Sequence, residues 1–207
     1  MSQNPPSRSL WLVCGAALLL FGLPACHTTA PTVKSHAALP VVAKVDLTRY
    51  AGTWHEVSRL PNRFQKSCLH STAEYTPLPN GGIQVRNTCY KAKGRMSVIT
   101  GTATPVTGSG NAKLKVKFGG FAALAAVPEE GNYWIVALDP AYRWSMVGTP
   151  DRKFLWMLSR QPSLSFPIYR QLKQQAKELG FDTGKLLPED DAPPGLVDLR
   201  RKTEPAS

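Results

Sequence analysis

The sequence has few of the residues that most often carry out catalysis or bind metals. It contains four cysteines and four histidines in 207 residues. Cys68 and Cys89 lie too far apart for a zinc site and have no histidines at ligand spacing. Gly-x-Ser-x-Gly and His-Glu-x-x-His motifs are also absent, which excludes the usual signatures of serine hydrolases and zinc proteases. We therefore expect no catalytic residue, no metal and no cofactor.

Acidic residues are also scarce, with 14 Asp and Glu against 25 Lys and Arg and a formal net charge of +11. A basic protein is attracted to anionic surfaces. The basic residues, however, are scattered along the chain. Over 113–118, lysines alternate with Leu114, Val116 and Phe118, which is typical of a half-buried strand with a solvated face. We expect no nucleic-acid partner.

The longest apolar run lies at the N-terminus. Residues 1–25 contain Arg8 and an apolar stretch over 10–23, followed by Cys26, as in a secretory signal. The stretch is shorter than the ~20 residues that a membrane span needs. It resembles a bacterial lipoprotein signal, which implies that Cys26 becomes the first residue and carries a lipid. The alternatives are a plain signal peptide and a single membrane span. His27 is not Asp, the residue that would mark retention in the inner membrane, so we expect an outer-membrane anchor.

The rest of the chain divides by composition. Residues 26–45 are rich in Thr, Ala, Pro and Val and predict a tether. Residues 46–187 predict a single domain. Residues 188–207 change from acidic to Pro-rich to basic, and predict a disordered tail.

The domain has the pattern of a β protein that ends in a helix. Asn80-Gly81 is a strong hairpin signal. Apolar residues recur at helical spacing over 165–179 and predict one amphipathic helix. The uncharged part of 119–131 is compatible with a helical turn or an apolar loop. We predict about eight antiparallel strands, the first within 49–60 and the others at 69–78, 82–92, 96–105, 113–118, 132–138, 142–147 and 154–160.

Three short motifs resemble the lipocalin family, and in particular its bacterial outer-membrane and apolipoprotein D-like members. They are Gly52-x-Trp54 in the first strand, Asp139 and Tyr142 in a turn, and Arg160 at the end of the last strand. The resemblance covers about 46–187. It implies an all-β fold, an eight-stranded antiparallel up-and-down barrel with the C-terminal helix packed outside. It also implies structural roles for these residues, with Trp54 closing the narrow end beneath Arg160.

The interior of such a barrel either holds a ligand or is filled by side chains, and periodicity alone does not separate the two. The resemblance favours a cavity, because lipocalins generally bind small hydrophobic molecules. An apolar lining with few polar groups suits fatty acids, lysophospholipids or similar amphiphiles. By strand alternation, the expected ligand-binding residues are Glu56, Ser58, Tyr75, Val116, Phe118, Tyr133, Ile135, Val147, Phe154 and Trp156.

Cys68 and Cys89 flank the hairpin around Asn80-Gly81 and would lie in an oxidising compartment. In the hairpin register, Cys68 lies a few positions before the partner of Cys89. A bulge or the preceding loop could bring the two together. A disulfide and a pair of buried thiols both fit this pattern.

The sequence thus predicts a binding protein for lipid storage, transport or envelope maintenance, anchored to the outer membrane and facing the periplasm. One alternative is an isomerase-like enzyme that uses Glu56 or His55 on a bound hydrophobe. Another is a structural envelope lipoprotein with a filled barrel that acts through its surface, for instance through 119–131. A homodimer is left open.

Overall fold

The computed structural model describes residues 37–120 and 126–187. The predictions for the signal segment 1–25, for the lipid anchor at Cys26 and for the tail 188–207 lie outside the described residues. So does the middle of the 119–131 segment. The described residues belong to one compact unit.

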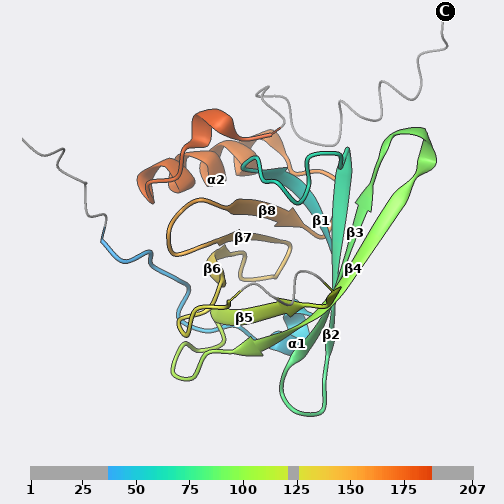
Figure 1. Ribbon diagram of the computed structural model, residues 1–207. Helices are drawn as coiled ribbons and strands as arrows, with labels where there is room; N and C mark the ends of the chain where they lie inside the picture. The colour runs from blue at the N-terminus through green and yellow to red at the C-terminus, as the bar shows by residue number, and fades with distance from the viewer. Residues whose placement is uncertain (1–36, 121–125, 188–207) are drawn as a thin grey trace, which may run out of the picture. The chain divides into compact units, whose positions relative to one another are not determined.

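Eight antiparallel strands close into a barrel in which each strand pairs with its neighbours in sequence and β8 pairs with β1 (Figure 1). This confirms the predicted up-and-down barrel. The strands are β1 (Gly52–Arg59), β2 (His70–Pro77), β3 (Ile83–Tyr90), β4 (Met96–Pro105), β5 (Lys113–Phe118), β6 (Tyr133–Leu138), β7 (Trp144–Gly148) and β8 (Leu155–Ser159).

The helix α2 (Phe166–Glu178) packs against the outside of the barrel wall, as predicted. Its buried Leu172 and Ala176 belong to the same apolar cluster as Leu155 and Met157 of β8. This outer core explains why Leu155 and Met157, on the outward face of β8, are both apolar. The helix is followed by Gly180 at φ +87°, a conformation that favours glycine.

Each end of the barrel has its own connections. The closed end carries the short helix α1 (Leu47–Tyr50) and the β2–β3, β4–β5 and β6–β7 turns. The predicted hairpin turn is confirmed, with Gly81 at φ +78°. The other end, here called the mouth, carries the β1–β2, β3–β4, β5–β6 and β7–β8 connections.

Residues 37–45, predicted to belong to a tether, instead pack along the barrel. Leu39 and Val45 are buried, and the amides of Val42 and Val45 donate to carbonyls of Ile135 and Gly110. The Val-rich composition of this segment therefore reflects apolar contact with the wall. Among residues 37–120 and 126–187, no helix has the length and hydrophobicity needed to cross a membrane.

Candidate functional site

The barrel interior contains an inner apolar core that is distinct from the core under α2. Predicted inward residues that are buried in it are Tyr75, Val116, Ile135 and Val147. Phe118, Tyr133 and Trp156 are partly buried against the same cluster. Phe154 precedes β8, and its ring stacks on that of Trp156 at a centroid distance of 5.9 Å.

The prediction that Ser58 faces the interior is wrong. The pairing of β1 with β8 shifts between Glu56 and Ser58, so Glu56 lies opposite Leu158 while Ser58 lies opposite the outward Met157. A bulge of this kind inserts one residue and reverses the alternation after it. Arg59 lies opposite Trp156 and therefore turns inward, although strict alternation would place it outside.

The closed end is sealed around Trp54, which is fully buried. The Arg160 guanidinium lies 3.9 Å from the centre of the Trp54 ring and donates to the Thr53 and Arg49 carbonyls at 2.9 and 2.8 Å. Gly52 adopts φ +88°, and a Cβ there would lie 3.4 Å from an Arg160 nitrogen. That distance is an ordinary contact, so it is the backbone conformation that favours glycine here.

Three tyrosines lie above this seal and join their hydroxyls inside the barrel. The hydroxyl of Tyr133 lies 2.8 Å from that of Tyr50 and 3.0 Å from that of Tyr75, and Tyr50 also meets the Ser145 hydroxyl at 3.1 Å. Burial raises the pKa of Tyr50 to about 12 and raises the pKa values of Tyr75 and Tyr133 as well. The cluster is therefore neutral at physiological pH. Tyr50 was missed from the sequence because it lies in α1 and not in a strand.

The β6–β7 turn at the closed end holds the buried carboxylate of Asp139. It accepts hydrogen bonds from the Arg143 side chain, at 2.8 Å to each oxygen, and from the amides of Ala141 and Arg143. The bond from Arg143 is the main cause that lowers the pKa of Asp139 to about 2. Tyr142 adopts φ +59° in this turn, and its hydroxyl accepts from the Asp46 amide at 2.9 Å. These contacts give Asp139 and Tyr142 structural roles.

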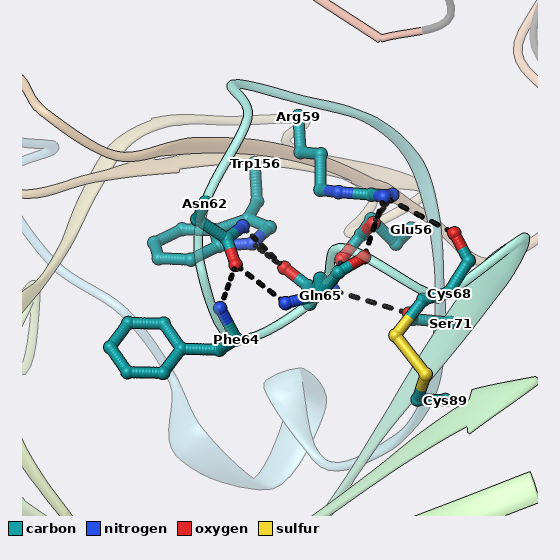
Figure 2. The surroundings of a disulfide bond; sticks show 9 residues. All are labelled: Glu56, Arg59, Asn62, Phe64, Gln65, Cys68, Ser71, Cys89 and Trp156. Carbon is teal, nitrogen blue, oxygen red and sulfur yellow. Dashed lines mark hydrogen bonds and ion pairs between the residues drawn. A yellow bond between two sulfur atoms is a disulfide. The ribbon is translucent and has the colours of Figure 1, made fainter.

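A second polar cluster lies near the mouth and is shown in Figure 2. The Glu56 carboxylate accepts from Arg59 at 2.6 Å and from the side-chain amide of Gln65 at 2.5 Å. Gln65 also donates to the Ser71 hydroxyl and accepts from the Trp156 indole N–H at 3.0 Å. One loop side chain thus links three neighbouring strands of the barrel, β8, β1 and β2.

This mouth cluster, defined by Glu56, Arg59, Gln65, Ser71 and Trp156, is largely withdrawn from water. The side chains of Glu56 and Arg59 are 8% and 11% exposed. Burial raises the pKa of Glu56, while the neighbouring Arg59 and Gln65 oppose that rise. Among the described residues, the buried Arg59 Nε atom has no hydrogen-bond partner. Such an atom indicates unused hydrogen-bonding capacity inside the barrel.

Asn87 adds a second atom of this kind. It lies on the same face of β3 as the buried Val85, and its side-chain oxygen is buried without a partner among the described residues. The interior near the mouth therefore offers one unused donor, on Arg59, and one unused acceptor, on Asn87.

The β1–β2 loop that supplies Gln65 is held in place by a disulfide. Cys68 and Cys89 are bonded, which confirms one of the two alternatives left open by the sequence. The backbone supports the link, because the Leu69 amide donates to the Tyr90 carbonyl at 2.8 Å and the rings of His70 and Tyr90 stack at 4.4 Å. Gln65 was missed from the sequence, since nothing local shows that a loop side chain turns into the barrel.

His55 lies on the outside of β1, across the strand from Glu56. Burial and the nearby His70 lower its pKa. Within the part of the chain that the structure describes, no group of three His, Cys, Asp or Glu side chains could hold a metal ion.

Comparisons with known proteins agree with this architecture. A family model described as lipocalin-like domain matches residues 45–191. Temperature-induced lipocalin-1 of Arabidopsis thaliana is 38% identical over 160 residues, covering 75% of this chain and 86% of that protein. The outer membrane lipoprotein Blc of Escherichia coli K12 is 34% identical, covering 83% and 92%. Apolipoprotein D of the mouse is 30% identical, covering 74% and 80%.

Solved structures support the fold alone, because their sequence identity is low. Insecticyanin from the tobacco hornworm Manduca sexta superposes with a TM-score of 0.54 at 17% identity, covering 74% of this chain and 85% of that one. The cockroach allergen Per a 4 gives a TM-score of 0.52 at 20% identity, covering 71% and 88%.

Proposed function

Because this chain belongs to the lipocalin-like family, we propose that it binds an amphiphile with its hydrocarbon chain inside the barrel and its polar head at the mouth cluster. The interior wall between the two polar clusters is apolar, with Val85, Val116, Val147 and Leu158 among its residues. Such a wall suits a hydrocarbon chain and gives it no polar partner.

The observation that carries this proposal is the pair of unpartnered buried atoms near the mouth, Arg59 Nε and Asn87 Oδ1. A buried polar group without a partner costs about 1–3 kcal/mol. A ligand head that presents an acceptor to Arg59 and a donor to Asn87 would recover part of that cost. Fatty acids present a carboxylate, which can accept from Arg59. Lysophospholipids present a phosphate that can accept from Arg59 and a glycerol hydroxyl that can donate to Asn87. Both classes can therefore satisfy Arg59, and the lysophospholipids can also satisfy Asn87.

Glu56 can balance the positive charge of Arg59, either as a carboxylate or by giving way to an anionic ligand head when it takes up a proton. A buried arginine without a counter-ion would be strongly unfavourable, and Glu56 supplies that counter-ion. When an anionic head reaches Arg59, Glu56 can take up a proton more readily than an exposed glutamate, because burial raises its pKa. Binding of an anionic amphiphile is thereby compatible with a buried carboxylate.

The proposed function is binding and not catalysis. The two candidate groups for an isomerase do not work together, because Glu56 is held by Arg59 and Gln65 inside the barrel while His55 lies outside. A general acid–base pair needs both groups within reach of one substrate.

We also propose that Cys26 carries a lipid and anchors the chain to the outer membrane. The N-terminal pattern supports this, as do the relatives that are named outer membrane lipoproteins. Changing Cys26 to Ser should release the protein from the outer-membrane fraction. Retention of the variant in that fraction after a salt wash would contradict the anchor.

The binding proposal is tested by titration with fatty acids and lysophospholipids of increasing chain length. Each methylene that enters the interior contributes about 0.8 kcal/mol, or roughly fourfold in affinity. We expect affinity to rise with chain length until the interior is full, and then to level off. A flat, millimolar response across the series would contradict the proposal.

A further inference from the structure

Exposed apolar side chains gather at one side of the mouth. Six large apolar residues of the described chain are exposed, and five of them belong to the β1–β2 loop or to the first half of β4. Phe64, Leu69 and Met96 are the most exposed, at 67%, 62% and 61%. The other two are Val98 and Ile99. We call residues 61–70 and 91–99 together the rim.

The two parts of the rim are joined to each other. The disulfide links Cys68 to Cys89, and Met96 lies opposite Tyr90, whose carbonyl accepts from the Leu69 amide. The β3–β4 hairpin extends beyond the neighbouring strands, as Figure 1 shows in green. Its outer part therefore stands clear of the barrel wall and can reach a surface.

The Lys, Arg, Asp and Glu residues of the rim are all basic. It contains Arg63, Lys66, Lys91, Lys93 and Arg95 and has neither Asp nor Glu. The carboxylates of the other mouth connections, Glu129, Glu130 and Asp151, belong to the segments that follow β5 and β7. The rim thus combines exposed apolar tips with cations, which is the composition of segments that bind the interface of anionic bilayers.

We propose that the rim docks the barrel mouth onto a bilayer that contains anionic phospholipids. Phe64, Leu69 and Met96 would enter the headgroup region, while the cations of both segments would contact phosphates. A second copy of this chain is a poor occupant, because a symmetric dimer would place the same five cations against each other. Docking goes beyond ligand binding, because it places the entrance to the barrel at a lipid surface.

The chain from residue 36 onward is the protein to test, because residues 37–120 and 126–187 belong to one compact unit and this span leaves out the predicted anchor. Binding is measured by co-sedimentation with vesicles of phosphatidylcholine, with and without phosphatidylglycerol. We expect binding to the anionic vesicles that weakens as salt is raised. Equal binding to both kinds of vesicle, or no binding to either, would overturn the proposal.

Charge reversal separates the rim from the general basicity of the protein. Each basic residue near an anionic surface raises binding about fivefold, so changing Lys91, Lys93 and Arg95 together to Glu should lower binding by about a hundredfold or more. The matched control changes Lys44, Arg170 and Lys177 to Glu, which alters net charge equally at exposed sites away from the rim. Equal losses in the two triple variants would overturn the proposal.

The apolar contribution is tested by changing Phe64, Leu69 and Met96 together to Ser. We expect a loss of about tenfold or more, whereas Phe166→Ser, an exposed site on α2, should change binding less than twofold. Circular dichroism checks that each variant is folded. If sedimentation shows a dimer that the rim variants disrupt, and the wild type ignores vesicles, the rim is a self-association surface and the proposal fails.

The acyl-chain titration in vesicle-free buffer distinguishes this inference from the proposed function. The Lys91, Lys93 and Arg95 variant should keep its ligand affinity within about twofold, because those side chains lie outside the barrel interior. Loss of vesicle binding with ligand affinity retained supports docking. Loss of both would show that the variant acts on the barrel itself and would contradict a separate role for the rim.

Discussion

Asp139 at the closed end and Glu56 near the mouth are both buried carboxylates, yet their pKa values shift in opposite directions. Asp139 receives two bonds from Arg143 and two from backbone amides, and its pKa falls to about 2. Glu56 also has an arginine partner, but burial outweighs that contact and its pKa rises. Hydrogen bonding is the main cause of the lowered pKa of Asp139, and desolvation is the main cause of the raised pKa of Glu56.

The surroundings of the two carboxylates also differ. At the closed end, Trp54 is covered by Arg160, and the tyrosine hydroxyls satisfy one another. Near the mouth, Arg59 and Asn87 retain unpartnered buried atoms. The closed end thus has its polar groups paired, whereas the mouth keeps unpaired buried atoms where the head of the proposed ligand would bind. The following changes test this division.

The largest effect is expected from Trp54→Ala. The indole is fully buried, stacks under Arg160 and donates to the Tyr50 carbonyl at 2.8 Å. Its removal leaves a cavity and should lower the free energy of unfolding by about 3–5 kcal/mol. The matched change Trp156→Ala near the mouth should cost less. Urea denaturation measures both, and equal losses would contradict a division between a stabilising end and a binding end.

Removal of the disulfide should have the next largest effect on stability. Cys68 and Cys89 are separated by 21 positions, and closing a loop of that size stabilises the folded state by about 3 kcal/mol. The double change of both cysteines to Ser should therefore lower unfolding free energy by that amount. Ligand exchange should also become faster, because the bond holds the loop that inserts Gln65. Unchanged exchange kinetics would show that the loop does not control access.

The opposed carboxylates give a smaller effect with a clear sign. The folded pKa of Asp139 is lowered, so its contribution is present above the ordinary pKa and is lost as pH falls toward about 2. At neutral pH, Asp139→Asn should cost about 1.5–3 kcal/mol, as expected for bonds to a charged group. The stability difference from wild type should shrink as the solution is acidified.

Glu56→Gln should show the opposite trend. Since the folded pKa of Glu56 is raised, the folded protein keeps this proton where the unfolded chain has lost it. The resulting contribution is present below the ordinary pKa and is lost as pH rises through the folded value. Wild type should therefore lose stability relative to Glu56→Gln as pH rises. Denaturation from acidic to neutral pH measures the stability of each variant against wild type. If the two stability differences change with pH in the same direction, the pKa values of Asp139 and Glu56 are not shifted in opposite directions.

The strands, the barrel and the outer helix could be predicted from the sequence because alternation and helical spacing are local signals. The bulge could not, since it depends on the register between β1 and β8, and it reversed Ser58 and Arg59. A break in alternation was visible, however, because Val57 and Leu60 are both apolar at a spacing of three. That spacing could have indicated that the alternation of inward and outward side chains is interrupted between Val57 and Leu60.

The contacts made by Tyr50 and Gln65 lay beyond sequence reasoning for a different reason. Both side chains come from segments outside the strands and meet partners up to 95 positions away. Local pattern carries no information about such contacts. Residues 37–45 were assigned to a tether for the same reason, because only the folded wall shows what Leu39 and Val45 contact.

Tryptophan fluorescence during lipid titration tests the central claim most directly. In the barrel, Trp134 and Trp144 belong to the outer core and Trp54 lies under Arg160, whereas Trp156 faces the interior beside Gln65 and Phe154. We predict that Trp156→Phe, with folding intact by circular dichroism, loses most of the ligand-dependent change, and that Trp54→Phe keeps it. An undiminished signal in Trp156→Phe would contradict the placement of the ligand.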